Sequence, residues 1–204
     1  MSKDKPSTER SRGRPVSIDK MSVLDAAVLT FWERGYEGAS LTDLTQAMKI
    51  SRPSLYSGFG GKADLFDAAL VRYAQTIGRA PLVAFEAERD IYKAVQTFLS
   101  ASAKGNRHAD YPRGCLIVCC ASTTAETAPK VRERLEHLYL ELQKRLIKRF
   151  DVETGLPVHI SSLQRAVMMI DLVHGQAIRA RVGWTKEELL KDLDIRTRSV
   201  LGLG

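Results

Sequence analysis

The chain has 204 residues, of which 44% are hydrophobic and 27% are charged, and this composition is ordinary for a globular protein with a buried core. Its longest apolar run, residues 115–121, is too short to cross a bilayer, and the polar, basic N-terminus has no signal-peptide stretch. We therefore expect a cytoplasmic protein with no membrane partner. All three cysteines lie within residues 115–120, and this odd number in a chain without an export signal favours reduced thiols over disulfides.

The net charge of +7 is compatible with nucleic acid as a partner, but the charge is spread along the chain. Residues 1–75 hold 11 basic and 9 acidic side chains, a balance of +2, and residues 76–204 hold 20 and 15, a balance of +5. The first twenty residues hold six basic and three acidic side chains. We expect residues 1–16 to form a basic, disordered arm, with a merely solubilising tail as the alternative.

The first elements in chain order are short helices. Apolar residues recur at helical spacing from Ser17, and Gly35 stands where this first helix is expected to stop. Ser40 and Asp43 have the spacing of a capping box and predict a second helix that ends near Lys49.

A third helix is expected to follow after a three-residue turn. Ser51 suits its N-cap, and Pro53 is tolerated in its first turn because the early N–H groups have no intrahelical partner. The glycines within residues 58–61 end it, and a fourth helix runs from Lys62 towards Pro81.

The remainder also predicts helices and no strand. We expect helices at 83–103, 114–125, 129–150, 160–182 and 185–200, with loops at 104–113 and 152–159. Thr185 and Glu188 mark the start of the last helix by their capping-box spacing. The fold class is therefore all-α, with a small N-terminal domain at 17–62 and a larger helical domain at 63–204.

Two short helices joined by a three-residue turn have the geometry of a helix-turn-helix, whose second helix enters the major groove of DNA. On a helical wheel, Leu55 and Phe59 point inward and a small polar face points outward. Arg52 suits a bidentate contact to guanine or a contact to phosphate, and Pro53 suits a thymine methyl. The candidate DNA-binding residues are Thr42, Arg52, Pro53, Ser54, Tyr56, Ser57 and Lys62, and their alternative role is only to build the small domain.

Residues 31–66, FWERGYEGASLTDLTQAMKISRPSLYSGFGGKADLF, resemble the DNA-binding domain of TetR-type transcriptional repressors, and GRP at 13–15 is similar to one branch of that family. The resemblance implies a homodimer of all-helical subunits that binds a palindromic operator on double-stranded DNA in the nucleoid. It also implies that residues 63–204 form an effector-binding and dimerisation domain, and that the effector is a small molecule that releases the DNA.

Two positions depart from the family pattern. Lys49 occupies the turn position that glycine usually holds, and a non-glycine residue in a left-handed turn costs on the order of 1 kcal/mol. Gly58 stands where the family places a larger residue before Phe59. These departures support an alternative function, a helical interaction protein whose helix-turn-helix no longer binds DNA.

The stretch RGCLIVCC at 113–120 is a second candidate site. Cys115 at a helix start beside Arg113 is expected to have a depressed pKa, because the helix dipole and the guanidinium favour the thiolate. Cys119 lies one turn further on the same face, so the pair suits a redox or electrophile sensor. The alternative is that the thiols fill a helix contact. Their spacing does not match a zinc site, and we expect no metal.

The 160–182 helix has a seam close to heptad spacing, which predicts packing in an intersubunit four-helix bundle or in an intramolecular core. The seam residues are Leu163, Val167, Ile170, His174, Ala177 and Arg181. Candidate effector-pocket residues are Phe98, Tyr111, Met168, Met169, His174 and Trp184, with core packing as the alternative. No catalytic triad, paired carboxylates or phosphate loop is recognisable, so we expect neither an enzyme nor a cofactor.

Overall fold

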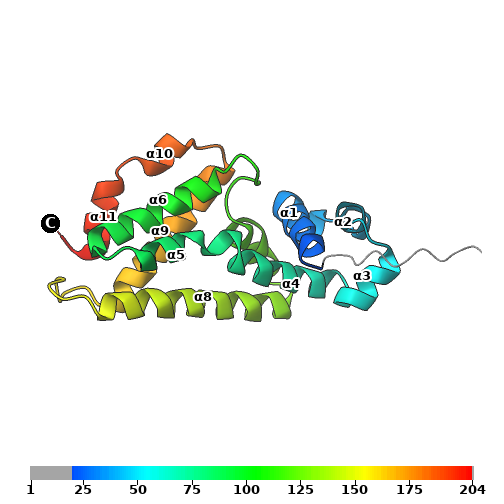
Figure 1. Cartoon of the computed structure of the whole chain (residues 1–204), viewed down its shortest axis with the longest axis horizontal. Coiled ribbons are helices and arrows are strands. Elements are labelled where there is room, and N and C mark those ends of the chain that lie inside the picture. Colours follow the sequence, from blue (N-terminus) through cyan, green and yellow to red (C-terminus); the bar gives the residue numbers. More distant parts are fainter. Residues whose placement is uncertain (1–19, 204) are drawn as a thin grey trace, which may run out of the picture.

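The three N-terminal helices form one end of an elongated molecule (Figure 1). The computed structural model describes residues 20–203, and this part of the chain is helical and contains no strand. The all-α prediction is therefore confirmed. The expected basic arm at 1–16 lies outside the described residues, as does the expected start of the first helix at Ser17.

The helix-turn-helix elements form where the capping residues predict them. The helices are α1 (Lys20–Gly38), α2 (Leu41–Met48), α3 (Arg52–Phe59) and α4 (Lys62–Gln75). Ser40 and Asp43 make the expected capping box on α2, and Ser51 accepts a hydrogen bond from the backbone N–H of Ser54 at the start of α3. Gly60 ends α3 with a φ of 87°, in the region that favours glycine.

The remaining elements form the body of the molecule. They are η1 (Ile77–Arg79), α5 (Ala80–Ala87), α6 (Ile91–Asn106), the π-helical η2 (Ile117–Ala121), α7 (Ser122–Thr124), α8 (Pro129–Asp151), α9 (Ser162–Arg181), α10 (Lys186–Leu190) and α11 (Leu193–Leu201). The expected helices at 129–150 and 160–182 match α8 and α9 closely. The capping box at Thr185 and Glu188 is present at α10.

Three expected helices are wrong in their extent. The helix from Lys62 stops at Gln75 instead of reaching Pro81, because the chain turns through η1 into α5. The helix expected at 83–103 is two helices, and Asp90 caps the second by accepting from the N–H of Lys93 at 2.9 Å. The helix expected at 185–200 is also two, separated where Asp192 adopts a φ of 59°.

The segment expected as a regular helix at 114–125 has a different geometry. It forms the π-helical turn η2 and then the single short turn α7. Gly114 precedes it with a φ of 83°, and a Cβ at that position would lie 2.7 Å from Cys119 Sγ and 2.9 Å from the carbonyl oxygen of Ala177. Only glycine fits this crossing between the chain and α9.

Two large apolar cores and one small cluster of Ala103, Ala180 and Leu189 hold the described part of the chain together. The first core joins α1–α4 to η2 and to the beginning of α8, with Phe31, Trp32, Leu55, Phe66 and Leu116 among its buried members. The second core joins α5, α6, α9 and α11 to the far end of α8. The first core runs across the expected domain boundary at residue 62, and α1 packs directly on the segment that carries the cysteines.

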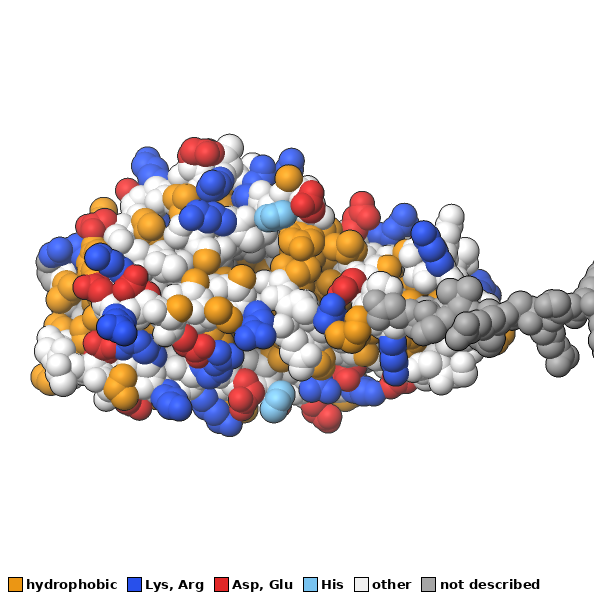
Figure 2. All heavy atoms as spheres, in the orientation of Figure 1, with side chains coloured by type: hydrophobic (Ala, Val, Ile, Leu, Met, Phe, Trp, Pro, Cys, Tyr) orange, Lys and Arg blue, Asp and Glu red, His pale blue; other side chains and the backbone are white. Residues whose placement is uncertain are grey.

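The face of the molecule shown in Figure 2 carries charges of both signs. On the face shown in Figure 2, Lys and Arg side chains are intermixed with Asp and Glu along the whole molecule. Between residues 20 and 203 there is no helix with the length and hydropathy needed to span a bilayer. In the same range, no three His, Cys, Asp or Glu side chains gather in an arrangement that could hold a metal ion.

Candidate nucleic-acid interface and cavity

Helix α3 has one buried face and one open face. Leu55 is fully buried in the first core, and Phe59 is half-buried against it. The exposed side chains of the helix are Arg52, Pro53, Ser54, Tyr56 and Ser57. None of these is acidic, and the polar ones are small or end in a hydroxyl or a guanidinium, so a polyanion can approach without repulsion.

The arginine of α3 is held in place by α2. Arg52 Nη2 donates a hydrogen bond to Thr42 Oγ1 at 2.9 Å, so two residues that the sequence assigned to DNA contact lie together. Both side chains are exposed. The bond fixes the guanidinium near the first turns of both helices and leaves its other N–H groups free to donate to a base or a phosphate.

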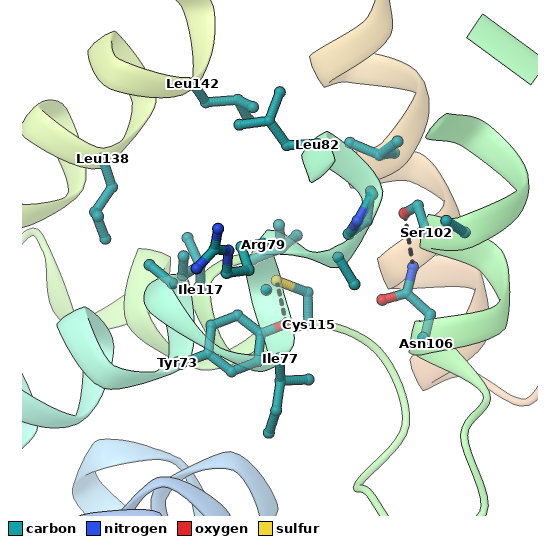
Figure 3. A pocket seen from close by; sticks show the side chains of 18 of the residues that line it. Tyr73, Ile77, Arg79, Leu82, Ser102, Asn106, Cys115, Ile117, Leu138 and Leu142 are labelled. Atoms are coloured by element: carbon teal, nitrogen blue, oxygen red, sulfur yellow. Dashed lines mark hydrogen bonds between the residues drawn. The ribbon is translucent and has the colours of Figure 1, made fainter. Parts of the chain in front are cut away.

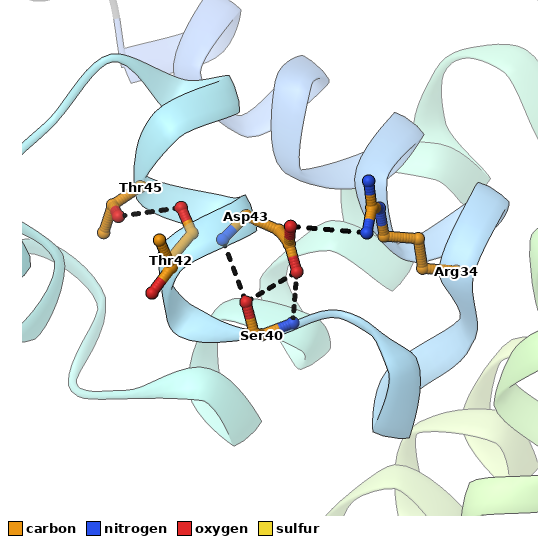
Figure 4. A network of polar contacts seen from close by, with 5 residues as sticks. All are labelled: Arg34, Ser40, Thr42, Asp43 and Thr45. Atoms are coloured by element: carbon orange, nitrogen blue, oxygen red, sulfur yellow. Dashed lines mark hydrogen bonds and ion pairs between the residues drawn. The ribbon is translucent and has the colours of Figure 1, made fainter.

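A polar network fixes the start of α2 on α1 (Figure 4). Asp43 accepts from the backbone N–H of Ser40 at 3.0 Å and forms an ion pair with Arg34 at 3.3 Å. The hydrogen bonds from Ser40 lower the pKa of the Asp43 carboxyl, with a smaller contribution from Arg34. The carboxylate is therefore ionised at neutral pH and orients the turn that carries Thr42.

Lys62 is less free than the sequence suggests. Its Nζ lies 4.5 Å from the centre of the Tyr36 ring, in a cation–π contact between α4 and α1. The residue is half-buried, whereas Tyr56 is 52% exposed and is the largest open side chain on α3. Contact of Lys62 with phosphate stays a prediction. It requires the Lys62 ammonium group to move away from the Tyr36 ring or to extend beyond it.

The two departures from the family pattern have different structural consequences. Lys49 adopts φ 53° and ψ 39°, the left-handed conformation, at the end of α2. Gly58 is exposed, and a Cβ built on it would meet nothing within 4 Å. The turn thus forms in spite of Lys49, and the absent side chain at residue 58 leaves open space rather than a distortion.

A cavity of about 240 Å³ lies inside the body, between α4, η1, α5, α6, η2, α8 and α9 (Figure 3). It brings together three of the predicted effector residues, Phe98, Cys115 and His174. Burial lowers the pKa of His174, and its ring makes an edge contact with Tyr139, so the imidazole is neutral at pH 7.

The structure places the other predicted pocket residues elsewhere. Tyr111 stacks on Trp32 with ring centres 5.7 Å apart, and Met168 packs in the second core, where Met169 is fully buried. Trp184 is exposed beside Arg179, whose guanidinium lies 5.3 Å from the ring centre. Cys119 Sγ faces the carbonyl oxygen of Ala177 at 3.7 Å, away from the cavity.

The expected depression of the Cys115 pKa is wrong. The thiol lies among protein atoms, and this desolvation raises its pKa, although the hydroxyl of Tyr73 donates to Sγ at 3.3 Å and partly opposes the shift. Burial also raises the pKa of Cys120, to about 11. The helix-dipole reasoning failed because residue 115 precedes a π-helical turn inside the protein rather than an exposed α-helix.

Sequence reasoning missed most of the polar residues that line the cavity. They are Tyr73, Arg79, Ser102, Asn106, Tyr139, Glu141 and Arg145. Ser102 and Asn106 are buried one turn apart on α6, where Asn106 Nδ2 donates to Ser102 Oγ at 3.4 Å. Two small polar residues on the otherwise apolar face of α6 were the signal that could have identified this part of the cavity.

The helix-turn-helix, its open polar face and the helical body with a cavity define a DNA-binding transcriptional regulator. Residues 23–69 match the model of the bacterial regulatory proteins of the tetR family. The chain is 29% identical to the HTH-type transcriptional repressor ComR of Escherichia coli over 90% of this chain and 89% of that protein. It is 30% identical to the uncharacterized HTH-type transcriptional regulator YezE of Bacillus subtilis, over 64% and 68% of the two chains.

A solved structure of a cysteine mutant of the TetR family transcriptional regulator CifR, complexed with 26-bp double-strand operator DNA, is also similar. It has a TM-score of 0.83 and 30% identity, and the likeness covers 91% of this chain and 99% of that one. The protein described here belongs to the TetR family of transcriptional regulators. It is a DNA-binding transcriptional regulator and is not an enzyme.

Proposed function

We propose that the protein is a repressor that binds a palindromic operator as a homodimer and that a small molecule bound in the cavity releases it. The observation that carries the proposal is the open face of α3, where Thr42 holds the guanidinium of Arg52. The similar protein CifR, whose structure is complexed with operator DNA, supports the proposal that the helix-turn-helix of this chain binds an operator. Such a repressor works on the nucleoid, in the cytoplasm.

An exposed apolar stripe on α9 supports the homodimer. Leu163, Val167, Ile178 and the C-cap residue Val182 are all at least 41% exposed. Their separations of 4, 11 and 4 residues are close to whole numbers of helical turns, which keeps them near one face of the helix. Large apolar side chains in a row on the surface mark a contact with another molecule. A second copy of the chain, related by a two-fold axis, would cover the stripe and set two copies of α3 on two half-sites.

The position of α4 supports release by a cavity ligand. Two residues separate α4 from α3, and α4 lines the cavity with Tyr73 and Ala74 near its other end. In its first two turns α4 forms ion pairs with α8, Asp64 with Lys130 and Asp67 with Arg134, the latter with N and O 2.7 Å apart. A ligand that binds better when α4 is displaced from α8 would shift the population towards conformers whose two α3 helices do not fit both half-sites.

The chemistry of Cys115 favours a reversibly bound effector over an electrophile or an oxidant. A thiol must ionise to attack such reagents, and desolvation raises the pKa of this one. The side chain is better suited to line a cavity than to react in it.

The test of DNA recognition is to select operators from random duplex DNA and then to measure affinity by fluorescence anisotropy at several salt concentrations. Arg52→Ala should lose about 1–3 kcal/mol of discrimination at one base pair in each half-site. Tyr56→Phe should weaken binding to all sequences alike, because it removes a hydroxyl suited to phosphate. Lys148→Ala, an exposed change far from α3 on α8, is the matched control.

Two outcomes would contradict the proposal. If no sequence is enriched and the affinity for any duplex is unchanged by Arg52→Ala and Tyr56→Phe, the chain is an interaction protein whose helix-turn-helix does not read DNA. If the protein sediments as a monomer at the concentrations at which it binds the selected site, and half-sites bind as tightly as the full palindrome, the dimeric arrangement is wrong.

A further inference from the structure

Some of the charged side chains around the cavity have an ion-pair partner among the described residues and one does not. Arg145 forms an ion pair with Glu86, and Glu141 forms one with Lys144 at 3.1 Å, so these two lining residues bring no net charge. Arg79 also lines the cavity, and no carboxylate of residues 20–203 lies within ion-pair distance of it. His174 is neutral at pH 7 because burial lowers its pKa. The described lining therefore carries one positive charge without a partner.

The backbone around Arg79 also borders the cavity. Arg79 is the last residue of η1 and stands at the N-cap of α5. The residues on both sides of it, Gly78, Ala80, Pro81 and Leu82, line the cavity as well. The N–H of Ala80 donates to the carbonyl oxygen of Ile77, and Pro81 has no N–H, so the guanidinium rather than the helix start supplies the positive charge here.

Figure 3 shows the guanidinium of Arg79 extending among the lining side chains, between Leu138 on α8 and Ile117 on η2. Leu82 and Leu142 lie on one side of it and Tyr73 and Cys115 on the other. The Ser102–Asn106 pair lies apart from it, against α6. The lining thus offers a cation next to apolar walls and a separate pair of buried hydrogen-bonding groups.

From this arrangement we infer that the cavity binds an organic anion with an apolar body and a single acid group, and that the acid group pairs with Arg79. The cavity has a volume of about 240 Å³, and one water-sized group occupies about 30 Å³. The cavity therefore suits a compact molecule with on the order of ten non-hydrogen atoms. The apolar body would lie against Leu82, Leu138 and Leu142, and a polar substituent at its far end would meet Ser102 and Asn106. The inference deepens the proposed function, on which it rests, by naming the chemical class of the effector.

A guanidinium is suited to this role because it stays charged at all relevant pH values and offers parallel N–H groups that match a carboxylate. Arg79 is an exposed residue of the lining, so water solvates its guanidinium and screening weakens the ion pair. A neutral molecule of the same shape would gain the apolar contacts without the ion pair. The difference between an acid and its amide therefore isolates the contribution of Arg79.

The experiment measures binding of three acids and their amides to the full-length protein by calorimetry. The pairs are phenylacetate and phenylacetamide, para-toluate and para-toluamide, and octanoate and octanamide. At least one acid should bind about threefold or more tightly than its amide, which is the size of effect that an exposed ion pair gives. Arg79→Gln should remove this preference and leave the affinity for the amide unchanged, Arg79→Lys should restore part of it, and Arg132→Gln, an exposed change on α8 outside the cavity, should have no effect.

Binding to the protein and release of DNA are measured separately, by calorimetry and by anisotropy with the selected operator. Three outcomes would each overturn the inference. They are equal binding of an acid and its amide, acid binding that Arg79→Gln does not weaken, and the absence of binding by any of the acids. If an acid binds through Arg79 but leaves the operator complex intact, the inference stands and release by a cavity ligand is refuted. If amides rather than acids dissociate the complex, the proposed function stands and the inference fails.

Discussion

Replacing Lys49 by glycine should stabilise the protein. Lys49 holds φ 53° and ψ 39°, and a residue with a Cβ costs about 1–2 kcal/mol in this region. Glycine removes that cost but adds about 0.4–1 kcal/mol of backbone entropy to the unfolded state. The Lys49 side chain is exposed and makes no ion pair with a residue between 20 and 203, so little else is lost. The balance is a gain of about 0.5–1 kcal/mol.

The assay is chemical denaturation of wild type, Lys49→Gly and Lys49→Ala at one protein concentration, with thermal melting alongside. Lys49→Ala keeps the Cβ and therefore the cost, so its unfolding free energy should stay near that of wild type. Lys49→Gly should also raise the Tm by about 1–4 °C for a chain of this size. A Lys49→Gly protein that is no more stable than Lys49→Ala would refute the reasoning, because the left-handed strain would then be no larger than the entropy that glycine adds to the unfolded state.

The remaining predictions concern the cap of α2, the cavity thiol and the junction between α9 and α1. Ser40→Ala should lower the unfolding free energy by about 1 kcal/mol, measured by urea denaturation, because it removes the N-cap of α2. The pKa of Asp43 is lowered in the folded state, so its stabilising contribution is present above the pKa it has when unfolded and is lost as the pH falls through the folded value. Ser40→Ala should therefore make the acid side of the stability profile shallower, and an unchanged profile would show that Ser40 does not stabilise this carboxylate. Cys115 should react with an aromatic disulfide reagent at pH 7 more slowly in the folded protein than in urea, because desolvation raises the pKa of its thiol. A faster reaction in the folded protein would contradict the raised pKa. Arg181→Ala should lower the unfolding free energy by about 1.5–3 kcal/mol, because the Arg181 guanidinium donates to two carbonyl oxygens at the end of α1, both at 3.3 Å. An effect no larger than that of the exposed Arg132→Ala would show that these hydrogen bonds do not stabilise the protein.

Much of the DNA-binding end could be predicted from sequence because its signals are local. A cap such as Ser40 or Ser51 acts on backbone groups two or three residues away, and Gly60 ends α3 through its own φ. The burial of Leu55 follows from the period of the helix. These features depend on neighbours in the chain, so the helix-turn-helix and its inward and outward faces were recognisable without the tertiary structure.

The interruptions in the body were harder to predict because the local pattern favours continuation. Apolar residues keep helical spacing from 83 to 103, and only Asp90, a good N-cap, marks the break between α5 and α6. Asp192 likewise separates α10 from α11 with a left-handed conformation that its residue type tolerates but does not require. The packing of each short helix on α6 or α9 decides where the chain bends.

The sequence by itself determined that the chain is helical, that a helix-turn-helix lies near its N-terminus and that the open face of α3 is small, polar and free of acidic residues. Only the tertiary structure decided which residues surround the cavity, because α4, η1, α6, η2, α8 and α9 contribute to it from positions far apart in the chain. It also decided the state of single groups. Cys115 is desolvated by segments distant in sequence, Lys62 lies over the ring of Tyr36, and Arg79 faces a cavity without a carboxylate partner among the described residues. Periodicity and capping act over one or two turns, whereas burial and charge pairing depend on which helices meet.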